Sequence, residues 1–97
     1  MSTYISLINF TEQGIRNIKD TASRQEAAKQ LLRDLGGEMK AIYLTMGAYD
    51  IVAIIDLPSD AAAARFALTT GALGNVRTTT LKAFTESEFK DIVQSLP

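Results

Sequence analysis

Gly47-Ala48-Tyr49-Asp50 joins two apolar runs of β-forming composition, residues 39–46 and 50–57. A glycine and a small residue between two such runs predict a tight hairpin, because glycine readily takes the positive φ of a type II′ turn. With this glycine and alanine at the centre of the turn, Leu44 lies opposite Ile51. The tetrapeptide therefore fixes the register of the two strands.

This register predicts a sheet that is apolar on both faces, because paired residues of neighbouring strands point to the same side. One face carries Ile42, Leu44, Met46, Tyr49, Ile51, Ala53 and Ile55, and the other carries Ala41, Tyr43, Thr45, Asp50, Val52, Ile54 and Asp56. Helices cover only one face of a four-stranded sheet. We therefore expect a second copy of the chain to cover the other face, in a homodimer or a ring of dimers.

The residues before the hairpin predict a strand and then a helix. Residues 4–10 are rich in β-formers and indicate a first strand. Residues 23–35 place alanine and leucine at the three- and four-residue spacing of one helix face. Gly36-Gly37 then ends the helix, because glycine tolerates the left-handed conformation. Residues 14–20, between strand and helix, fit either a loop or a helical turn.

The residues after the hairpin repeat the pattern. Ser59 or Asp60 caps a helix that continues to Leu73, and the β-branched segment 75–84 predicts a fourth strand. Thr85-Glu86-Ser87-Glu88 is a capping box that opens a final helix. The order β-α-β-β-α-β predicts a ferredoxin-like α+β fold with a four-stranded antiparallel sheet and a C-terminal helix. At 97 residues the chain is a single domain, 1–97.

The composition excludes several kinds of chemistry. The chain has no cysteine, so disulfides, thiolate nucleophiles and thiolate metal sites are excluded. It has no histidine either, which removes the commonest general base and transition-metal ligand. The ten basic and eleven acidic residues are scattered rather than clustered, unlike a nucleic-acid surface. We expect no metal, no cofactor and no nucleic-acid partner.

The sequence contains no membrane signal. No window approaches the roughly 18 apolar residues of a membrane span, and the N-terminus lacks a charged leader followed by an apolar stretch. We therefore expect a cytoplasmic protein that does not contact the membrane.

Several motifs, taken in order, resemble those of the GYD domain family over nearly the whole chain. They are Asn9-Phe10-Thr11 with Gly14-Ile15, Gly36-Gly37, Gly47-Ala48-Tyr49-Asp50 followed by Ile51-Val52-Ala53-Ile54-Ile55, and Gly71-Ala72-Leu73-Gly74-Asn75-Val76-Arg77-Thr78. The resemblance implies a ferredoxin-like subunit of the dimeric α/β-barrel type, from a family whose biochemical role is generally unassigned. It brings no catalytic residues with it.

Tyr49 and Asp50 are the first candidates for a functional site, and two interpretations stay open for them. In the structural one, Asp50 accepts backbone hydrogen bonds near the turn, as aspartate commonly does. In the functional one, the Tyr49 hydroxyl and the Asp50 carboxylate lie at the mouth of a pocket, where they bind a ligand or act as an acid/base pair.

Arg77, Thr78 and Tyr43 complete the ligand-binding candidates. Arg77 could hold a small carboxylate or phosphate, or it could pair with a carboxylate of the protein. Strand alternation places Arg77 and Thr79 on one side and Thr78 on the other, so they cannot all serve one ligand.

Two classes of function follow from these observations. The favoured one is a homo-oligomeric module that binds a small molecule or assembles with partners and has no catalysis of its own. The alternative is a cofactor-free enzyme of the dimeric α/β-barrel type that acts on a small apolar substrate. Without histidine, such an enzyme needs a strongly desolvated carboxylate as its base.

Overall fold

The centre of the fold is a four-stranded antiparallel sheet in the order β2-β3-β1-β4, seen in a computed structural model that describes residues 1–97. The strands are β1 (Ser2–Phe10), β2 (Glu38–Leu44), β3 (Ile51–Leu57) and β4 (Val76–Ala83). Each neighbouring pair is antiparallel. The α+β class, the four strands and their β-α-β-β-α-β order agree with the prediction from the sequence.

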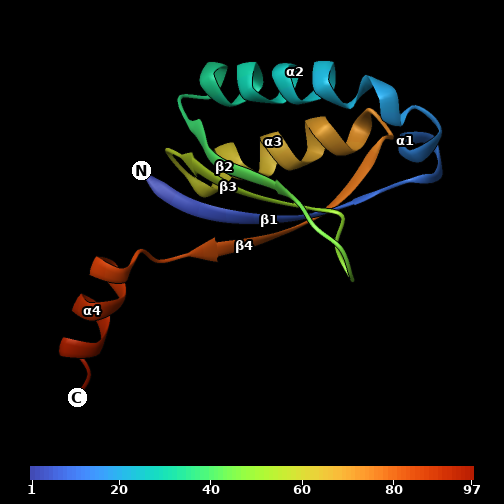
Figure 1. Ribbon diagram of the computed structural model, residues 1–97. Helices are drawn as coiled ribbons and strands as arrows, with labels where there is room; N and C mark the ends of the chain where they lie inside the picture. Colours follow the sequence, from blue (N-terminus) through green and yellow to red (C-terminus); the bar gives the residue numbers. More distant parts are fainter.

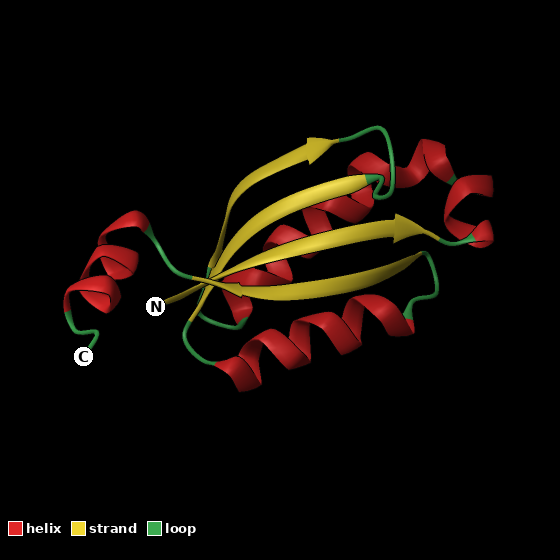
Figure 2. Ribbon diagram, turned by 90° about the horizontal axis from the view of Figure 1, so that it is seen from below, coloured by secondary structure: helices red, strands yellow, loops and turns green.

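The helices lie on one face of this sheet. α2 (Thr21–Asp34) and α3 (Asp60–Ala72) cover that face, while no helix lies over the other (Figure 1). The uncovered face is turned toward the viewer in Figure 2. The segment that the sequence left open is helical and consists of α1 (Glu12–Arg16) and the 3-10 turn η1 (Ile18–Asp20). α4 (Glu86–Gln94) leads away from the end of β4 and lies beside the domain rather than on it (Figure 1).

The helix boundaries follow from local hydrogen bonds. After α2, the Gly37 N–H donates to the Leu32 carbonyl at 2.8 Å and the Gly36 N–H donates to the Arg33 carbonyl at 3.0 Å. These two bonds form a Schellman motif, and Gly36 takes the left-handed φ of 88° that the motif requires. The Ser59 side chain caps α3. The capping box predicted at Thr85 is present at the start of α4.

The hairpin between β2 and β3 keeps the predicted register but has a longer loop. Leu44 pairs with Ile51 as expected. The strands end there, and the last bond across the loop runs from the Thr45 N–H to the Asp50 carbonyl at 2.8 Å. Gly47 has the expected positive φ, 129°. The two-residue turn is therefore wrong, although its glycine has the predicted conformation.

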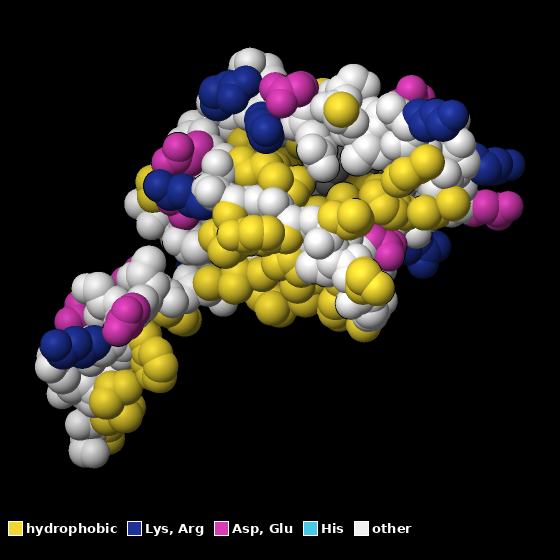
Figure 3. Space-filling model, viewed as in Figure 1, with side chains coloured by type: hydrophobic (Ala, Val, Ile, Leu, Met, Phe, Trp, Pro, Cys, Tyr) yellow, Lys and Arg dark blue, Asp and Glu magenta, His cyan; other side chains and the backbone are white.

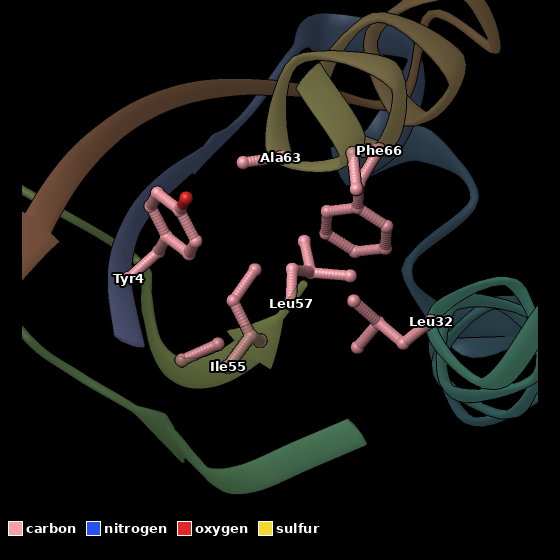
Figure 4. Packing of buried hydrophobic residues seen from close by; sticks show 8 residues of the cluster. Tyr4, Leu32, Ile55, Leu57, Ala63 and Phe66 are labelled. Atoms are coloured by element: carbon pink, nitrogen blue, oxygen red, sulfur yellow. The ribbon is translucent and has the colours of Figure 1, made fainter. Parts of the chain in front are cut away.

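The core lies between α2, α3 and the covered face of the sheet. Tyr4 comes from β1, alternate residues such as Ile55 come from β3, and Leu32 and Phe66 come from the two helices (Figure 4). The whole cluster consists of Tyr4, Leu32, Ala53, Ile55, Leu57, Ala62, Ala63 and Phe66. A β-bulge between Met39 and Ala41 also turns Met39 toward this core together with Ile42.

Candidate functional site

Asp50 ties the start of β3 to the end of β1. Its carboxylate Oδ2 accepts a hydrogen bond from the Phe10 N–H at 2.9 Å. Its own N–H donates to the Ile8 carbonyl at 2.9 Å. The carboxylate thus satisfies a backbone donor at the end of a central strand, which is the structural role considered for it from the sequence.

Tyr49 participates in the loop through its backbone. Its carbonyl accepts a hydrogen bond from the Thr45 hydroxyl at 2.6 Å, which closes the loop below Gly47. No hydrogen bond is formed by the Tyr49 hydroxyl within the chain, and neither Tyr49 nor Asp50 lines the cavity between the helices and the sheet. Neither residue lines the hollow beside Tyr4 and Asp60 either.

The other three predicted residues lie on opposite sides of the sheet. Tyr43 is exposed on the uncovered face, in register with Val52. Arg77 is exposed on the same face, in register with Asn9, and forms no ion pair. Thr78 lies on the covered face and lines a cavity. The five candidates therefore do not form one site.

The cavity has a volume of about 100 Å³ and lies between α2, α3 and the covered face of the sheet. Most of its lining is apolar, with side chains from all four strands and both helices, among them Ile8, Phe66 and Val76. This concave site with few polar groups has the character of small-molecule pockets, although it is smaller than their usual range of about 300–1,000 Å³.

The polar side chains of the cavity are ones that sequence reasoning did not select, apart from Thr78. Ser6 from β1 and Arg24 and Gln25 from α2 line it. Ser6 is only 2 % exposed and stands between Tyr4 and Ile8 on the covered side of β1. In the sequence, Ser6 is a small polar residue on an otherwise apolar face of the first strand, and this pattern could have indicated it as a site residue. Arg24 is the only ionisable side chain in the lining.

A second polar cluster lies where β1 and β4 meet the start of α3. The Tyr4 hydroxyl donates to Asp60 Oδ1 at 2.5 Å, and Lys82 Nζ lies 3.2 Å from the same oxygen. Burial and then the bond to Asp60 raise the pKa of Tyr4. The hydrogen bond from Tyr4, followed by that from Lys82, lowers the pKa of Asp60. These contacts give the buried Tyr4 hydroxyl its hydrogen-bond partner and leave it neutral at physiological pH.

The uncovered face of the sheet is a continuous apolar surface, which we call the open face. Strand pairing places Ile5 beside Ile54 and Leu81, and Leu7 beside Val52. The open face consists of Ile5, Leu7, Ala41, Tyr43, Val52, Ile54 and Leu81. Polar groups border it, with Asn9 and Arg77 at one end and Thr3 and Asp56, joined by a 2.9 Å hydrogen bond, at the other.

α4 presents a second apolar surface that its own chain leaves uncovered. Phe89, Ile92 and Val93 share one side of the helix, Leu96 follows the helix, and all four are between 42 % and 64 % exposed. Figure 3 shows hydrophobic side chains gathered along the lower edge of the domain and on one side of α4. The two apolar surfaces therefore flank a common space below the sheet.

No group of three or more acidic side chains is arranged to hold a metal ion. None of the helices combines the length and the apolar character needed to span a bilayer.

The GYD domain model matches residues 4–93, and the chain belongs to this family. A glutamine synthetase and cystathionine beta-lyase binding protein of Thermus thermophilus is 33 % identical over 84 residues, covering 86 % of this chain and 88 % of that protein. The crystal structure of TTHA0845, also from Thermus thermophilus, is similar, with a TM-score of 0.51 and 28 % identity, over 87 % of this chain and 94 % of that one. The family resemblance read from the sequence is confirmed.

Proposed function

We propose that this chain is a binding module without catalysis of its own, which assembles with copies of itself and binds a protein partner. The observation that carries this proposal is the open face together with the uncovered apolar side of α4. In this proposal the subunit is ferredoxin-like and pairs in the manner of dimeric α/β-barrel proteins, as a dimer or a ring of dimers. A cytoplasmic location stays a prediction of the sequence.

The anatomy of the open face supports self-association. Its centre on β1 and β3 is apolar, an aromatic side chain, Tyr43, lies beside it on β2, and charged groups such as Arg77 and Asp56 border it. An apolar centre with a polar border is typical of protein interfaces. Burying each large apolar side chain contributes about 1.5–3 kcal/mol. Several such side chains on each subunit together offset an association cost of about 4–15 kcal/mol.

The length of α4 supports the same interface. α4 has 9 residues, and isolated helices shorter than about 12–15 residues are marginal in water even with good caps. Its capping box stabilises the first turn only. The helix gains the remaining stability when Phe89, Ile92 and Val93 pack on another subunit. We place them at the edge of the partner subunit's sheet, because the apolar side of α4 flanks the space below the open face (Figure 3).

The named relative supports a protein partner. That protein is named for binding glutamine synthetase and cystathionine beta-lyase, and the similarity covers most of both chains. The enzyme alternative has less support, because no carboxylate or tyrosine lines the cavity and Arg24 is its only ionisable side chain. A desolvated carboxylate base, which a histidine-free enzyme would need, is missing from that lining.

Self-association is tested by sedimentation velocity on Ile54→Lys, which places a charge at the centre of the open face. We expect the wild type to sediment as a dimer or larger species and the variant as a monomer. Leu68→Lys is the matched control, because Leu68 is exposed on α3, away from the open face. A monomeric wild type at micromolar concentration would remove the self-association proposal.

The protein partner is tested by calorimetric titration of the purified chain into glutamine synthetase and, separately, into cystathionine beta-lyase from the same source. We expect a saturable heat with at least one of the two enzymes. No heat with either enzyme would limit the proposal to self-assembly.

A further inference from the structure

The cavity under α2 and α3 contains a buried hydroxyl that the protein itself does not use. Ser6 is 2 % exposed and lines the cavity, and no hydrogen bond within the chain involves its hydroxyl. Every side-chain nitrogen or oxygen that is fully buried has a hydrogen-bond partner. Because the Ser6 hydroxyl has no partner, it is not fully buried and is accessible from the cavity that Ser6 lines. Thr78, also in the lining, has a second hydroxyl without a partner in the chain. Both hydroxyls are therefore available as hydrogen-bond partners for a molecule bound in the cavity.

Arg24, which carries a positive charge, also lines the cavity. Its guanidinium donates to the Asn17 carbonyl at 2.9 Å, to the Thr21 hydroxyl at 3.2 Å and to the Gly14 carbonyl at 3.5 Å. All three acceptors are neutral, and Arg24 forms no ion pair. These bonds fix the side chain at the α1 end of the cavity and leave its charge uncompensated. A carboxylate is the group that such a guanidinium binds best.

The size of the cavity limits the apolar part of the ligand. A cavity of about 150 Å³ lined by aliphatic and aromatic residues accommodates the six carbons of benzene. By proportion, a cavity of about 100 Å³ takes a tail of about four carbons. The apolar lining, including Ile8, Ala53 and Phe66, suits an aliphatic tail.

We propose that this cavity binds a short aliphatic carboxylic acid, with its tail among the apolar side chains, its carboxylate at Arg24, and the Ser6 and Thr78 hydroxyls available as hydrogen-bond partners. The site lies on the covered face of the sheet, opposite the open face. It therefore does not depend on the proposed self-association, and either proposal can fail while the other holds.

The test is titration of the 97-residue chain with sodium pentanoate, followed by amide chemical shifts in NMR. We expect saturable shifts at Ser6, Phe66 and Thr78 and none at Tyr43 or Leu81 on the open face. From acetate to pentanoate, the affinity rises about fourfold for each CH₂ group that enters the cavity. The neutral analogue pentanamide binds at least about tenfold more weakly than pentanoate, because it lacks the charge.

Two pairs of variants separate the site from general effects. Arg24→Gln weakens pentanoate binding at least about tenfold but changes pentanamide binding little, whereas Arg33→Gln, on the exposed side of α2, leaves both unchanged. Ala28→Leu fills the cavity with Arg24 intact and abolishes binding, while Ala27→Leu, exposed on the same helix, does not. Leucine is a good helix former, so both alanine variants are expected to fold.

Three results would overturn the proposal. They are the absence of saturable shifts with pentanoate, equal shifts with acetate and pentanoate, and full binding to folded Ala28→Leu. Monomeric Ile54→Lys is expected to bind pentanoate as the wild type does, because the cavity lies within one chain. Loss of binding in that variant would contradict a site that is independent of self-association.

Discussion

Asp50 is the residue whose role changes most between sequence and structure. It is the last residue of the tetrapeptide Gly47-Ala48-Tyr49-Asp50, and the sequence suggested it as an acid or a ligand contact. In the structure its carboxylate accepts a hydrogen bond from the Phe10 N–H at 2.9 Å. This hydrogen bond from a backbone N–H at the end of β1 to a carboxylate at the start of β3 stabilises the pairing of the two central strands. Its neighbour Tyr49 contributes a backbone carbonyl to the same loop. Both observations favour a structural role for the tetrapeptide.

We expect Asp50→Ala to lower the free energy of unfolding by about 1.5–3 kcal/mol, because the Phe10 N–H loses a charged partner. Asp50→Asn keeps an oxygen acceptor and should cost about half as much. Urea unfolding measures both. Asp34→Ala is the control, since Asp34 is exposed and bonds only to Gln30 in its own helix. An Asp50→Ala protein of wild-type stability would return Asp50 to the list of functional candidates.

The Asp60 carboxyl makes stability dependent on pH. Its pKa lies below the ordinary value of 3.8, first because the Tyr4 hydroxyl donates to it and then because Lys82 does. A carboxyl with a lowered pKa in the folded state stabilises the protein above its unfolded pKa. This contribution is lost as the pH falls through the lower pKa of the folded state.

We therefore expect Asp60→Asn to be less stable than the wild type near neutral pH, and the difference to shrink as the pH falls below 3.8 and through the lower pKa of the folded state. Urea midpoints over this range measure it. In Tyr4→Phe the ring stays buried but the hydrogen bond is lost, so an NMR titration should find the pKa of Asp60 raised toward 3.8. A difference between wild type and Asp60→Asn that does not change with pH would contradict this account.

At the scale of elements, α4 is the part whose stability depends on something outside its own chain. Its apolar side, with Ile92 at the centre, is exposed although its capping box is complete. We expect Ile92→Lys to weaken self-association at least about tenfold, because a buried isoleucine contributes about 1.5–3 kcal/mol. Sedimentation equilibrium gives the dissociation constant.

The control for α4 is Asp91→Lys, which also adds positive charge but lies on the side of the helix away from the apolar residues. It should leave the dissociation constant nearly unchanged. Far-ultraviolet circular dichroism should also show α4 losing helix in monomeric Ile92→Lys. Equal effects of the two variants would indicate that charge, rather than the apolar side of α4, governs association.

At the scale of the whole molecule, the proposed assembly links stability to concentration. Only 11 of the 97 residues are buried in the single chain, a small core for its length. Covering the open face and α4 in an oligomer adds apolar burial that the monomer lacks.

We expect the thermal midpoint to rise by about 3 °C for each tenfold increase in protein concentration, by mass action on a dimer of this size. Differential scanning calorimetry across about a hundredfold range of concentration measures this. Monomeric Ile54→Lys should have a lower midpoint that does not change with concentration. A concentration-independent wild-type midpoint would point to a monomeric protein.

The sequence predicted most elements because their signals are local. Glycine at 36 and the capping box at Thr85 specify helix ends through backbone hydrogen bonds a few residues away. The register of Leu44 with Ile51 followed from alternation and a glycine. The longer hairpin loop was missed because its end depends on Asp50 bonding to β1, forty residues earlier in the chain. The β-bulge after Met39 was not predicted, because no residue pattern in that segment was read as a bulge.

The candidate site was predicted less well, because a site depends on which faces the fold brings together. Alternation separated Arg77 from Thr78 correctly, and the structure places them on opposite faces of β4. Sequence spacing alone did not indicate that Ser6 of β1, Arg24 of α2 and Thr78 would line one cavity. These residues meet only because α2 folds back over the sheet.

The sequence by itself determined the family, the order of helices and strands, the register of the central hairpin and the presence of apolar residues on both sheet faces. These features depend on residue periodicity, glycine conformations and caps, which act over a few residues. Only the tertiary structure decided which face α2 and α3 cover, where the cavity lies and that α4 stands apart with its apolar side uncovered. Those features depend on contacts between residues far apart in the chain, for which a single sequence carries no local signal.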